Sequence, residues 1–282
     1  GLRTARQRAL AVDRFADRVD DATEPRLVGV HRSVMTLKDR LAVVTGAASG
    51  IGSAVAGKLA AAGATVIVAD IQADKGKARA AEIESGGGRA QYVEVDLTRT
   101  DAIAAFAETV HKRFGTVDVL VNGAGWGRTA PFWDGTPEFW QQLMALNLMG
   151  PLHLTKALLP PMIQRGGGRI VNIASDAGRV GSLGETVYAA AKGGLIAFTK
   201  SLARETARYG IGVNCVCPGP TDTPLMAAVP DKVKEALIKA IPLRRLGKPE
   251  EVADAVLFFA GDGASYCTGQ VLSVSGGLTM AG

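Results

Sequence analysis

The stretch Thr45-Gly46-Ala47-Ala48-Ser49-Gly50-Ile51-Gly52 is a glycine-rich turn, and it decides the fold of this 282-residue chain. It follows the apolar run 41–44, which is typical of a buried strand, and precedes residues 53–60, which are typical of a helix. Such a turn lets backbone amides approach a pyrophosphate, whose charge the positive end of the helix dipole favours. The spacing G-x-x-x-G-x-G departs from the G-x-G-x-x-G pattern, so the glycines need support from the rest of the chain.

Asp70 provides part of that support. It ends a second apolar run, 65–69, and lies twenty residues after Gly50. A carboxylate in this place is suited to accept hydrogen bonds from the ribose hydroxyls of an adenosine. The three residues after Asp70 and Ser49 in the glycine turn offer no cation for the 2′-phosphate of NADP. We therefore expect NAD as the coenzyme; the alternative is an aspartate that only caps a helix.

Tyr188 and Lys192 stand four residues apart in an alanine-rich stretch that favours a helix, so they share one helical face. Ser175 lies thirteen residues before the tyrosine. An ammonium favours the phenolate, so we expect the pKa of Tyr188 to be lowered from about 10 toward the working pH. Such a tyrosine can exchange a proton with an alcohol or a carbonyl oxygen. The spacing alone also suits an ordinary helix, and the glycine turn favours the catalytic interpretation.

Apolar runs alternate with helical stretches along the chain, which predicts right-handed parallel β-α-β units. Gly150 and Pro151 predict a kink or bulge near Asn147. The proline-bracketed segment 221–245 is predicted to form a mobile lid over the substrate. We place strands near 41–45, 65–69, 90–95, 117–121, 169–174, 211–216 and 270–274, and helices near 50–62, 74–85, 100–113, 137–164, 187–209, 223–239 and 249–260.

In this order the motifs resemble the short-chain dehydrogenase/reductase family over residues 37–282. The resemblance implies an α/β protein with a single-domain Rossmann fold, a doubly wound seven-stranded parallel sheet with helices on both faces. It implies a catalytic set of Asn147, Ser175, Tyr188 and Lys192. The coenzyme-binding positions that it implies are Gly46, Ser49, Gly50, Ile51, Gly52, Asp70, Asp96, Leu97, Asn122, Ala124, Gly125, Tyr188, Lys192, Pro218, Gly219, Thr221 and Thr223. The family's usual N-N-A-G is here Asn122-Gly123-Ala124-Gly125, a departure that affects local hydrogen bonding.

The expected chemistry is hydride transfer between a secondary alcohol or ketone and a nicotinamide coenzyme. Ser175 follows a strand, so its hydroxyl can stabilise charge on the substrate oxygen at the coenzyme edge of the sheet. Tyr188 transfers the proton. By resemblance, Lys192 tunes Tyr188 and binds the nicotinamide ribose, and Asn147 holds a water that links Lys192 to solvent.

The substrate depends on loops, and the candidate pocket residues are Trp126, Arg128, Phe132, Trp133, Asp176, Arg179, Val180, Glu185, Pro220 and Met226. The stretches 172–182 and 269–280 resemble 2-hydroxycyclohexanecarboxyl-CoA dehydrogenases, which implies a cyclic or β-hydroxyacyl-CoA substrate. Arg128 or Arg179 could then meet a CoA phosphate, and a surface salt bridge is the alternative for either. A broader secondary-alcohol dehydrogenase, a 3-oxoacyl-carrier-protein reductase and a non-catalytic dinucleotide-binding regulator remain open.

Composition excludes some other classes. The formal charge of +5 includes +2 from residues 1–36, which hold seven arginines and five acidic residues, and this modest excess does not indicate nucleic acid. Three cysteines form no disulfide or metal-ligand set, and we expect no metal. No apolar stretch is long enough for a membrane helix, so we expect a cytoplasmic protein. Residues 1–36 are an upstream extension, a targeting segment or a helical arm. By resemblance we expect a homotetramer through the helices predicted at 137–164 and 187–209.

Overall fold

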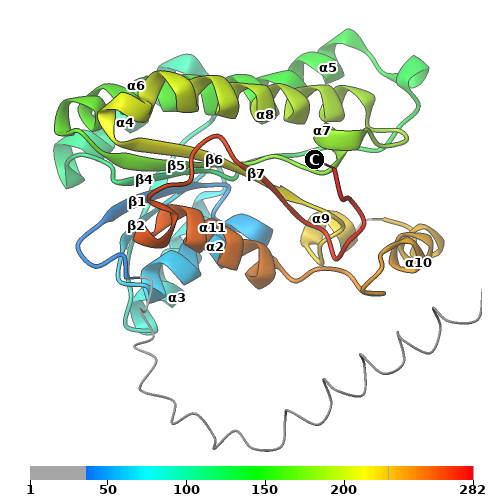
Figure 1. Cartoon of the computed structure of the whole chain (residues 1–282), viewed down its shortest axis with the longest axis horizontal. Helices are drawn as coiled ribbons and strands as arrows, with labels where there is room; N and C mark the ends of the chain where they lie inside the picture. Colours follow the sequence, from blue (N-terminus) through cyan, green and yellow to red (C-terminus); the bar gives the residue numbers. More distant parts are fainter. Residues whose placement is uncertain (1–35, 228, 282) are drawn as a thin grey trace, which may run out of the picture. The chain divides into compact units, whose positions relative to one another are not determined.

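The computed structural model describes residues 36–227 and 229–281, which belong to one compact unit. The three alternatives for residues 1–36 therefore lie outside the described residues, except at Thr36. Seven strands, each parallel to its neighbours, form one sheet in the order β3-β2-β1-β4-β5-β6-β7 (Figure 1). The strands are β1 (Leu41–Thr45), β2 (Thr65–Asp70), β3 (Arg89–Glu94), β4 (Val119–Asn122), β5 (Gly168–Ile173), β6 (Ile211–Pro218) and β7 (Val271–Val274). The predicted seven-stranded parallel sheet is confirmed.

Helices cover both faces of this sheet (Figure 1). One face carries α2 (Gly50–Ala61), α3 (Ala73–Ser85) and α11 (Pro249–Ala260), and the other carries α4 (Thr100–Phe114), α6 (Gly150–Arg165) and α8 (Thr186–Thr206). The shorter helices are α5 (Pro137–Met144), α7 (Ala177–Val180), α9 (Pro224–Ala227) and α10 (Asp231–Ala240). Single turns of 3-10 helix occupy η1 (Phe132–Asp134), η3 (Ala207–Tyr209) and η4 (Asp262–Ala264).

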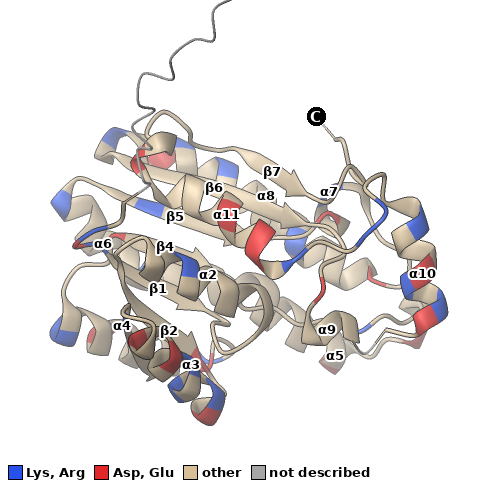
Figure 2. Cartoon of the chain, turned by 90° about the horizontal axis from the view of Figure 1, so that it is seen from below, with Lys and Arg blue, Asp and Glu red and all other residues tan. Residues whose placement is uncertain are grey.

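The two-sided cover explains why the central strands are continuous apolar runs. β1 is buried along its whole length. Successive side chains of a strand point to opposite faces, so Val44 packs in the core cluster with α2 and α11, while Val43 packs in the cluster with α4 and α6. Charged side chains instead gather on outer helices such as α3 and α10 (Figure 2). Within the described ranges, no helix has the length and apolar character needed to cross a membrane.

The predicted long helix 137–164 is interrupted by a π-helical turn, η2 (Ala145–Met149). Pro151 has no N–H to donate to the carbonyl of Asn147, four residues earlier, and this missing bond favours a wider turn. A Cβ atom at Gly150 would lie 2.7 Å from the carbonyl oxygen of Leu97, so the chain passes close to the loop after β3. The expected bulge near Asn147 is confirmed.

The predicted helix 223–239 is wrong, because the segment divides into α9 and α10. Pro230 is the residue directly before α10 and has a non-helical ψ of 141°, and its missing N–H cannot continue the hydrogen bonding of a helix from α9. Two separate helices, of four and ten residues, therefore replace one continuous helix. The predicted mobility of residues 221–245 stays a prediction.

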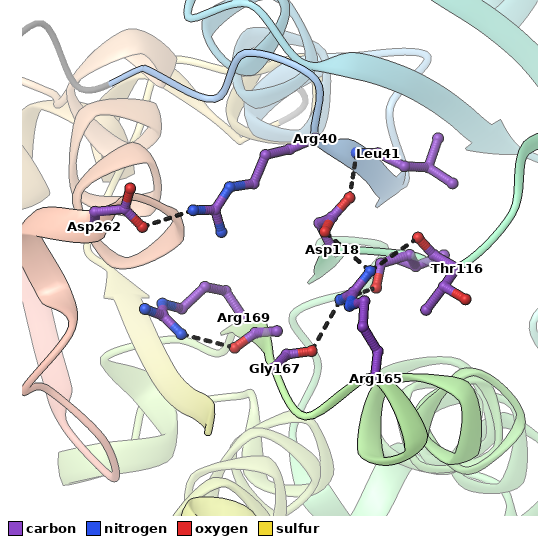
Figure 3. A network of polar contacts seen from close by, with 10 residues as sticks. Arg40, Leu41, Thr116, Asp118, Arg165, Gly167, Arg169 and Asp262 are labelled. Atoms are coloured by element: carbon purple, nitrogen blue, oxygen red, sulfur yellow. Dashed lines mark hydrogen bonds and ion pairs between the residues drawn. The ribbon is translucent and has the colours of Figure 1, made fainter. Parts of the chain in front are cut away.

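Charged side chains hold the amino ends of the strands together, as Figure 3 shows. Asp118, just before β4, accepts a hydrogen bond from the Leu41 amide at 2.7 Å and pairs with Arg165 at 2.9 Å. Arg40 pairs with Asp262 at 2.7 Å. Burial, followed by the charge of Arg40, lowers the pKa of Arg169. These contacts join β1, β4, β5 and α6, and the glycine turn lies at the opposite edge of the sheet.

Candidate active site

The glycine turn after β1 has backbone angles and close contacts that residues with side chains could not accommodate. Gly46 and Gly50 have φ angles of 68° and 53°, a region that favours glycine. A Cβ atom at Gly52 would lie 2.2 Å from the Gly46 carbonyl oxygen, and one at Gly46 would lie 2.7 Å from the Ala124 Cα. The Ser49 side chain does not cap α2, so the first amides of the helix keep their capacity to bind an anion. This cradle fits a dinucleotide pyrophosphate.

Asp70 supports this turn from the end of β2. Its carboxylate is 7 % exposed and accepts hydrogen bonds from the amides of Ala48 at 3.0 Å and Gln72 at 2.9 Å. The helix-capping alternative fails, because α3 begins at Ala73 and has Gln72 as its N-cap. Each carboxylate oxygen retains a lone pair for ribose hydroxyls.

The two residues after β3 differ in character. Asp96 is half-buried, and one of its carboxylate oxygens accepts hydrogen bonds from the Thr98 amide at 2.9 Å and the Thr98 hydroxyl at 2.6 Å. Leu97 is 5 % exposed and packs in the core cluster with α4 and α6. Asp96 therefore keeps a carboxylate oxygen for a ligand, while Leu97 offers only its backbone.

The segment after β4 contains one residue whose side chain turns away from the predicted coenzyme site. The Asn122 amide nitrogen donates to Thr155 at 3.1 Å and to Asn172 at 2.8 Å, and the residue is 1 % exposed. This side chain links β4 to β5 and α6 in the core, so a coenzyme contact at this position falls to the backbone.

The departure at Gly123 is explained by a residue that sequence reasoning missed. The Thr45 hydroxyl accepts hydrogen bonds from the amides of Gly123 at 3.0 Å and Ala124 at 3.2 Å. A Cβ atom at Gly123 would lie 2.8 Å from the Thr45 carbonyl oxygen. The sequence signal for this contact was a threonine at the end of the first strand together with a glycine after the fourth strand.

Asn147 and Lys192 meet beside Gly125. The Asn147 amide donates to the Trp126 carbonyl at 2.7 Å and accepts from the Trp126 amide at 3.2 Å, so the π-helical turn holds the loop after β4. The Lys192 ammonium donates to the Ile173 carbonyl at 3.0 Å. A Cβ atom at Gly125 would lie 2.9 Å from Asn147 Oδ1 and 3.1 Å from Lys192 Nζ, so only glycine leaves room here for both groups.

Tyr188 and Ser175 complete this set. A Cβ atom at Gly127 would lie 3.2 Å from the Tyr188 ring, so the loop after β4 runs along the tyrosine. The Lys192 ammonium is 5.7 Å from the centre of that ring. The Ser175 hydroxyl accepts a hydrogen bond from the Ala177 amide at 3.1 Å, and hydrogen bonding to Ser175 affects the pKa of Tyr188. Strand β5, helix α8 and the π-helical turn thus bring four distant residues together.

The expected lowering of the tyrosine pKa is wrong in this structure. Burial raises the pKa of Tyr188 to about 12, the charge of Glu185 adds to the rise, and the hydrogen bond to Ser175 opposes it. Burial also lowers the pKa of Lys192 to about 8. Desolvation penalises the charged form of both groups and is the main cause of both shifts.

The loop after β6 lies against the glycine turn. Gly219 follows the last residue of β6, Pro218, and the Thr221 hydroxyl donates to the Gly219 carbonyl at 2.9 Å. The Thr223 side chain lies 3.6 Å from the position of a Cβ atom at Gly50. These residues sit where the sequence places them, at the carboxyl edge beside the start of α2.

The predicted pocket residues divide by their contacts. Arg179 donates to the Ser273 hydroxyl at 2.7 Å and to the Ala281 carbonyl, and Asp176 accepts a hydrogen bond from Ser273. Asp176 therefore contacts β7, and Arg179 joins β7 to the C-terminal tail, which ends near α7 in Figure 1. Arg128 is exposed and lies over the Phe139 ring at 4.6 Å. Of the others, Trp126, Phe132, Trp133 and Val180 are exposed, and Glu185, Pro220 and Met226 are half-buried.

Comparison with known proteins agrees with this arrangement. A family model described as enoyl-(acyl carrier protein) reductase matches residues 46–279. The chain belongs to the short-chain dehydrogenase/reductase family. Its members are oxidoreductases, which supports a nicotinamide cofactor.

Two curated relatives and one solved structure illustrate the similarity. The chain is 41 % identical over 246 residues to the 3-oxoacyl-[acyl-carrier-protein] reductase FabG of Thermotoga maritima, covering 87 % of this chain and 100 % of that one. It is 43 % identical over 243 residues to the acetoacetyl-CoA reductase of Rhizobium meliloti, covering 86 % and 99 %. A gluconate 5-dehydrogenase from Burkholderia cenocepacia, in complex with NADP and tartrate, is similar with a TM-score of 0.84 and 34 % identity, covering 88 % and 98 %.

Proposed function

We propose that this protein interconverts a secondary alcohol and a ketone, with a 3-hydroxyacyl or 3-oxoacyl thioester, or a cyclic hydroxy acid, as the substrate class. The main support for the proposal is that four polar side chains lie together near the glycine turn, where added side chains would clash. They are Ser175, Tyr188, Lys192 and Asn147. The relatives named as reductases of 3-oxoacyl and acetoacetyl thioesters support this class.

The cradle and Asp70 would hold a nicotinamide dinucleotide, which supplies or accepts the hydride when bound. Ser175 accepts a hydrogen bond from the Ala177 amide, and its own hydroxyl, which is within reach of Tyr188, would donate to the substrate oxygen when a ketone binds between them. That donor stabilises the negative charge that develops on the oxygen during ketone reduction. Tyr188 is a neutral phenol at neutral pH and donates the proton that makes the alcohol.

Lys192 and Asn147 supply the next proton. The pKa of Lys192, about 8, lies close to neutral pH, so this group can give up and recover a proton under working conditions. Asn147 is buried and fixed by both backbone groups of Trp126, which keeps its Oδ1 beside the lysine. An ordered water between this pair and solvent would return the proton to Tyr188.

We propose NAD as the preferred coenzyme. The support is the buried Asp70 carboxylate, which would face the 2′-phosphate of NADP with a like charge. The Burkholderia cenocepacia neighbour, which is in complex with NADP, supports the opposite preference. Catalytic efficiencies with NADH and NADPH at equal ketone concentration decide between them, and a higher value for NADPH would overturn the proposal.

The experiment that tests the activity is reduction of acetoacetyl-CoA, an acyl-carrier-protein thioester and cyclic ketones by the purified full chain, followed through coenzyme absorbance. Turnover with any of them supports an enzyme, and the preferred ketone distinguishes a thioester reductase from a broader alcohol dehydrogenase. A chain that binds the coenzyme but turns over none of them would be the non-catalytic regulator.

We further propose that copies of this chain associate through α6 and α8. A groove of about 420 Å³ lies between these helices, and apolar side chains line most of it, among them Leu152, Leu159, Ile163 and Phe198. Burying such a surface against a second copy is favourable by roughly 25 cal/mol per Å². This supports a dimer or tetramer that uses these helices.

A further inference from the structure

Three consecutive residues after β4 contact the catalytic set. Gly125 lies against Asn147 and Lys192, the Trp126 backbone bonds to Asn147, and Gly127 lies against the Tyr188 ring. The next residue, Arg128, has its Cα only about 3.8 Å from that of Gly127. The backbone of Arg128 therefore follows directly on the residues that contact the catalytic set, and its guanidinium lies against Phe139, which packs on Trp126.

The Arg128 guanidinium is held in position without being neutralised. It lies 4.6 Å from the centre of the Phe139 ring, which itself packs edge-on to Trp126 at 5.7 Å. A cation over an aromatic face is attracted by the ring and keeps its full charge. Among residues 36–227 and 229–281, Arg128 forms no recorded ion pair or hydrogen bond with a side chain or carbonyl.

Two acidic residues adjoin the segments that pack in this region. Glu138 precedes Phe139 on α5, and Glu185 precedes α8, where Gly184 accepts a hydrogen bond from the Ala130 amide at 2.9 Å. Neither forms an ion pair with Arg128 among the described residues. The other candidate cation, Arg179, is already bound to Ser273 and Ala281. Of the two arginines considered for contact with an anionic group, Arg128 is therefore the better candidate.

We propose that Arg128 binds an oxyanion of the substrate, either a carboxylate or a phosphate, and so makes this a dehydrogenase of anionic alcohols and ketones. This inference rests on the proposed alcohol and ketone chemistry. A guanidinium offers a planar fork that matches both groups in a bidentate manner. Because its contact is remote from the reacting carbon, Arg128 acts on substrate selection and not on proton transfer.

Matched substrates test the inference. One pair is acetoacetate and its methyl ester, and the other is acetoacetyl-CoA and the acetoacetyl thioester of N-acetylcysteamine, which lacks phosphates. We expect the wild type to prefer the anionic member of at least one pair, and Arg128→Ala to reduce that preference about tenfold, mainly through KM. The pair that responds identifies the anion as carboxylate or phosphate. A preference that persists unchanged in Arg128→Ala overturns the proposal.

Arg113→Ala is the matched control, because Arg113 is also exposed and lies over the neighbouring Phe114 ring at 4.9 Å, on α4. This substitution should leave the preference for the anion intact. Arg128→Lys keeps the positive charge and loses the planar guanidinium, so we expect this variant to retain part of the preference that Arg128→Ala loses. An equal loss in Arg113→Ala would show an effect of general charge and would count against Arg128.

Tryptophan fluorescence separates this inference from the proposed function. All three tryptophans, Trp126, Trp133 and Trp140, lie in the segment around Arg128. Acetoacetate or CoA should therefore change the emission of the wild type and of Arg113→Ala, and not that of Arg128→Ala. Binding without turnover would retain the anion site and refute the activity. Turnover without an Arg128-dependent preference for the anion, and without an emission change, would support the activity and refute the anion site.

Discussion

The phenol of Tyr188 has a pKa of about 12, since burial removes water from the phenolate and Glu185 adds a like charge. At neutral pH the hydroxyl is therefore protonated, which is the form that reduces a ketone. Alcohol oxidation needs the opposite form and has to draw on the lysine beside it. Ketone reduction can therefore begin without a prior change in the charge of Tyr188, whereas alcohol oxidation cannot.

Replacing Tyr188 with Phe removes this proton donor and keeps the ring packed against Gly127. Since a positioned acid contributes about 10² to 10⁴-fold to a rate, we expect kcat to fall by that factor. The coenzyme affinity, measured by titration of NADH fluorescence, should stay near the wild-type value. Turnover close to that of the wild type would refute the role of Tyr188 in proton transfer.

Lys192 should make stability depend on pH. Its pKa is about 8 in the folded protein, against 10.5 when exposed, so the unfolded chain binds more protons between these values. Stability from this group is full above pH 10.5 and is lost as the pH falls through 8. Relative to Lys192→Met, the wild type should gain about 2 kcal/mol in unfolding free energy between pH 7 and 9.5. Urea denaturation of both proteins measures this difference, and parallel curves would contradict a depressed pKa.

At the scale of the elements, the amino and carboxyl edges of the sheet differ in what they do. The amino edge is held by Asp118, Arg165 and the Arg40–Asp262 pair (Figure 3). At the carboxyl edge, the π-helical turn and the loops after β1, β4 and β6 are fixed by close glycine contacts and by neutral side chains, such as Asn147, Thr45 and Thr221, that bond to backbone groups. Rigid strand starts therefore support strand ends that are shaped for a ligand.

Asp118→Ala should destabilise the fold without touching the catalytic residues. It leaves the buried Leu41 amide without its acceptor and Arg165 without its ion pair, at a cost of about 1–3 kcal/mol. Thermal or urea unfolding measures the loss. Asp101→Ala is the control, because Asp101 pairs with Arg99 on the exposed surface and should change little. Equal losses of stability in the two variants would show that the Asp118 contacts contribute no more to the free energy of unfolding than an exposed ion pair.

At the scale of the whole molecule, the apolar groove between α6 and α8 is the surface that predicts association. Ile163→Glu places a charge in this groove, which a second copy could not bury at low cost. We expect light scattering after size-exclusion chromatography to give an oligomer for the wild type and a smaller species for Ile163→Glu. Ala81→Glu, at an exposed position on α3, is the control. A monomeric wild type would contradict the proposed assembly.

Much of this molecule could be predicted from its sequence, because the features concerned are local. The apolar runs gave the strands, and Gly150 with Pro151 gave the bulge at Asn147, since a proline removes a specific backbone donor. The division of 223–239 was missed, although Pro230 was visible. The Asn122 side chain and the tie between Arg179 and the C-terminal tail could not be foreseen. Their partners, Thr155, Asn172, Ser273 and Ala281, are distant in the chain.

The sequence by itself determined the parallel sheet, the glycine cradle and the family, because periodicity and backbone freedom are written in neighbouring residues. Only the tertiary structure showed that burial raises the pKa of Tyr188 and that Arg179 is bonded to Ser273 and Ala281 while Arg128 lies over the Phe139 ring. Both depend on burial and on contacts between distant segments, and spacing along the chain carries no information on how much water reaches a side chain.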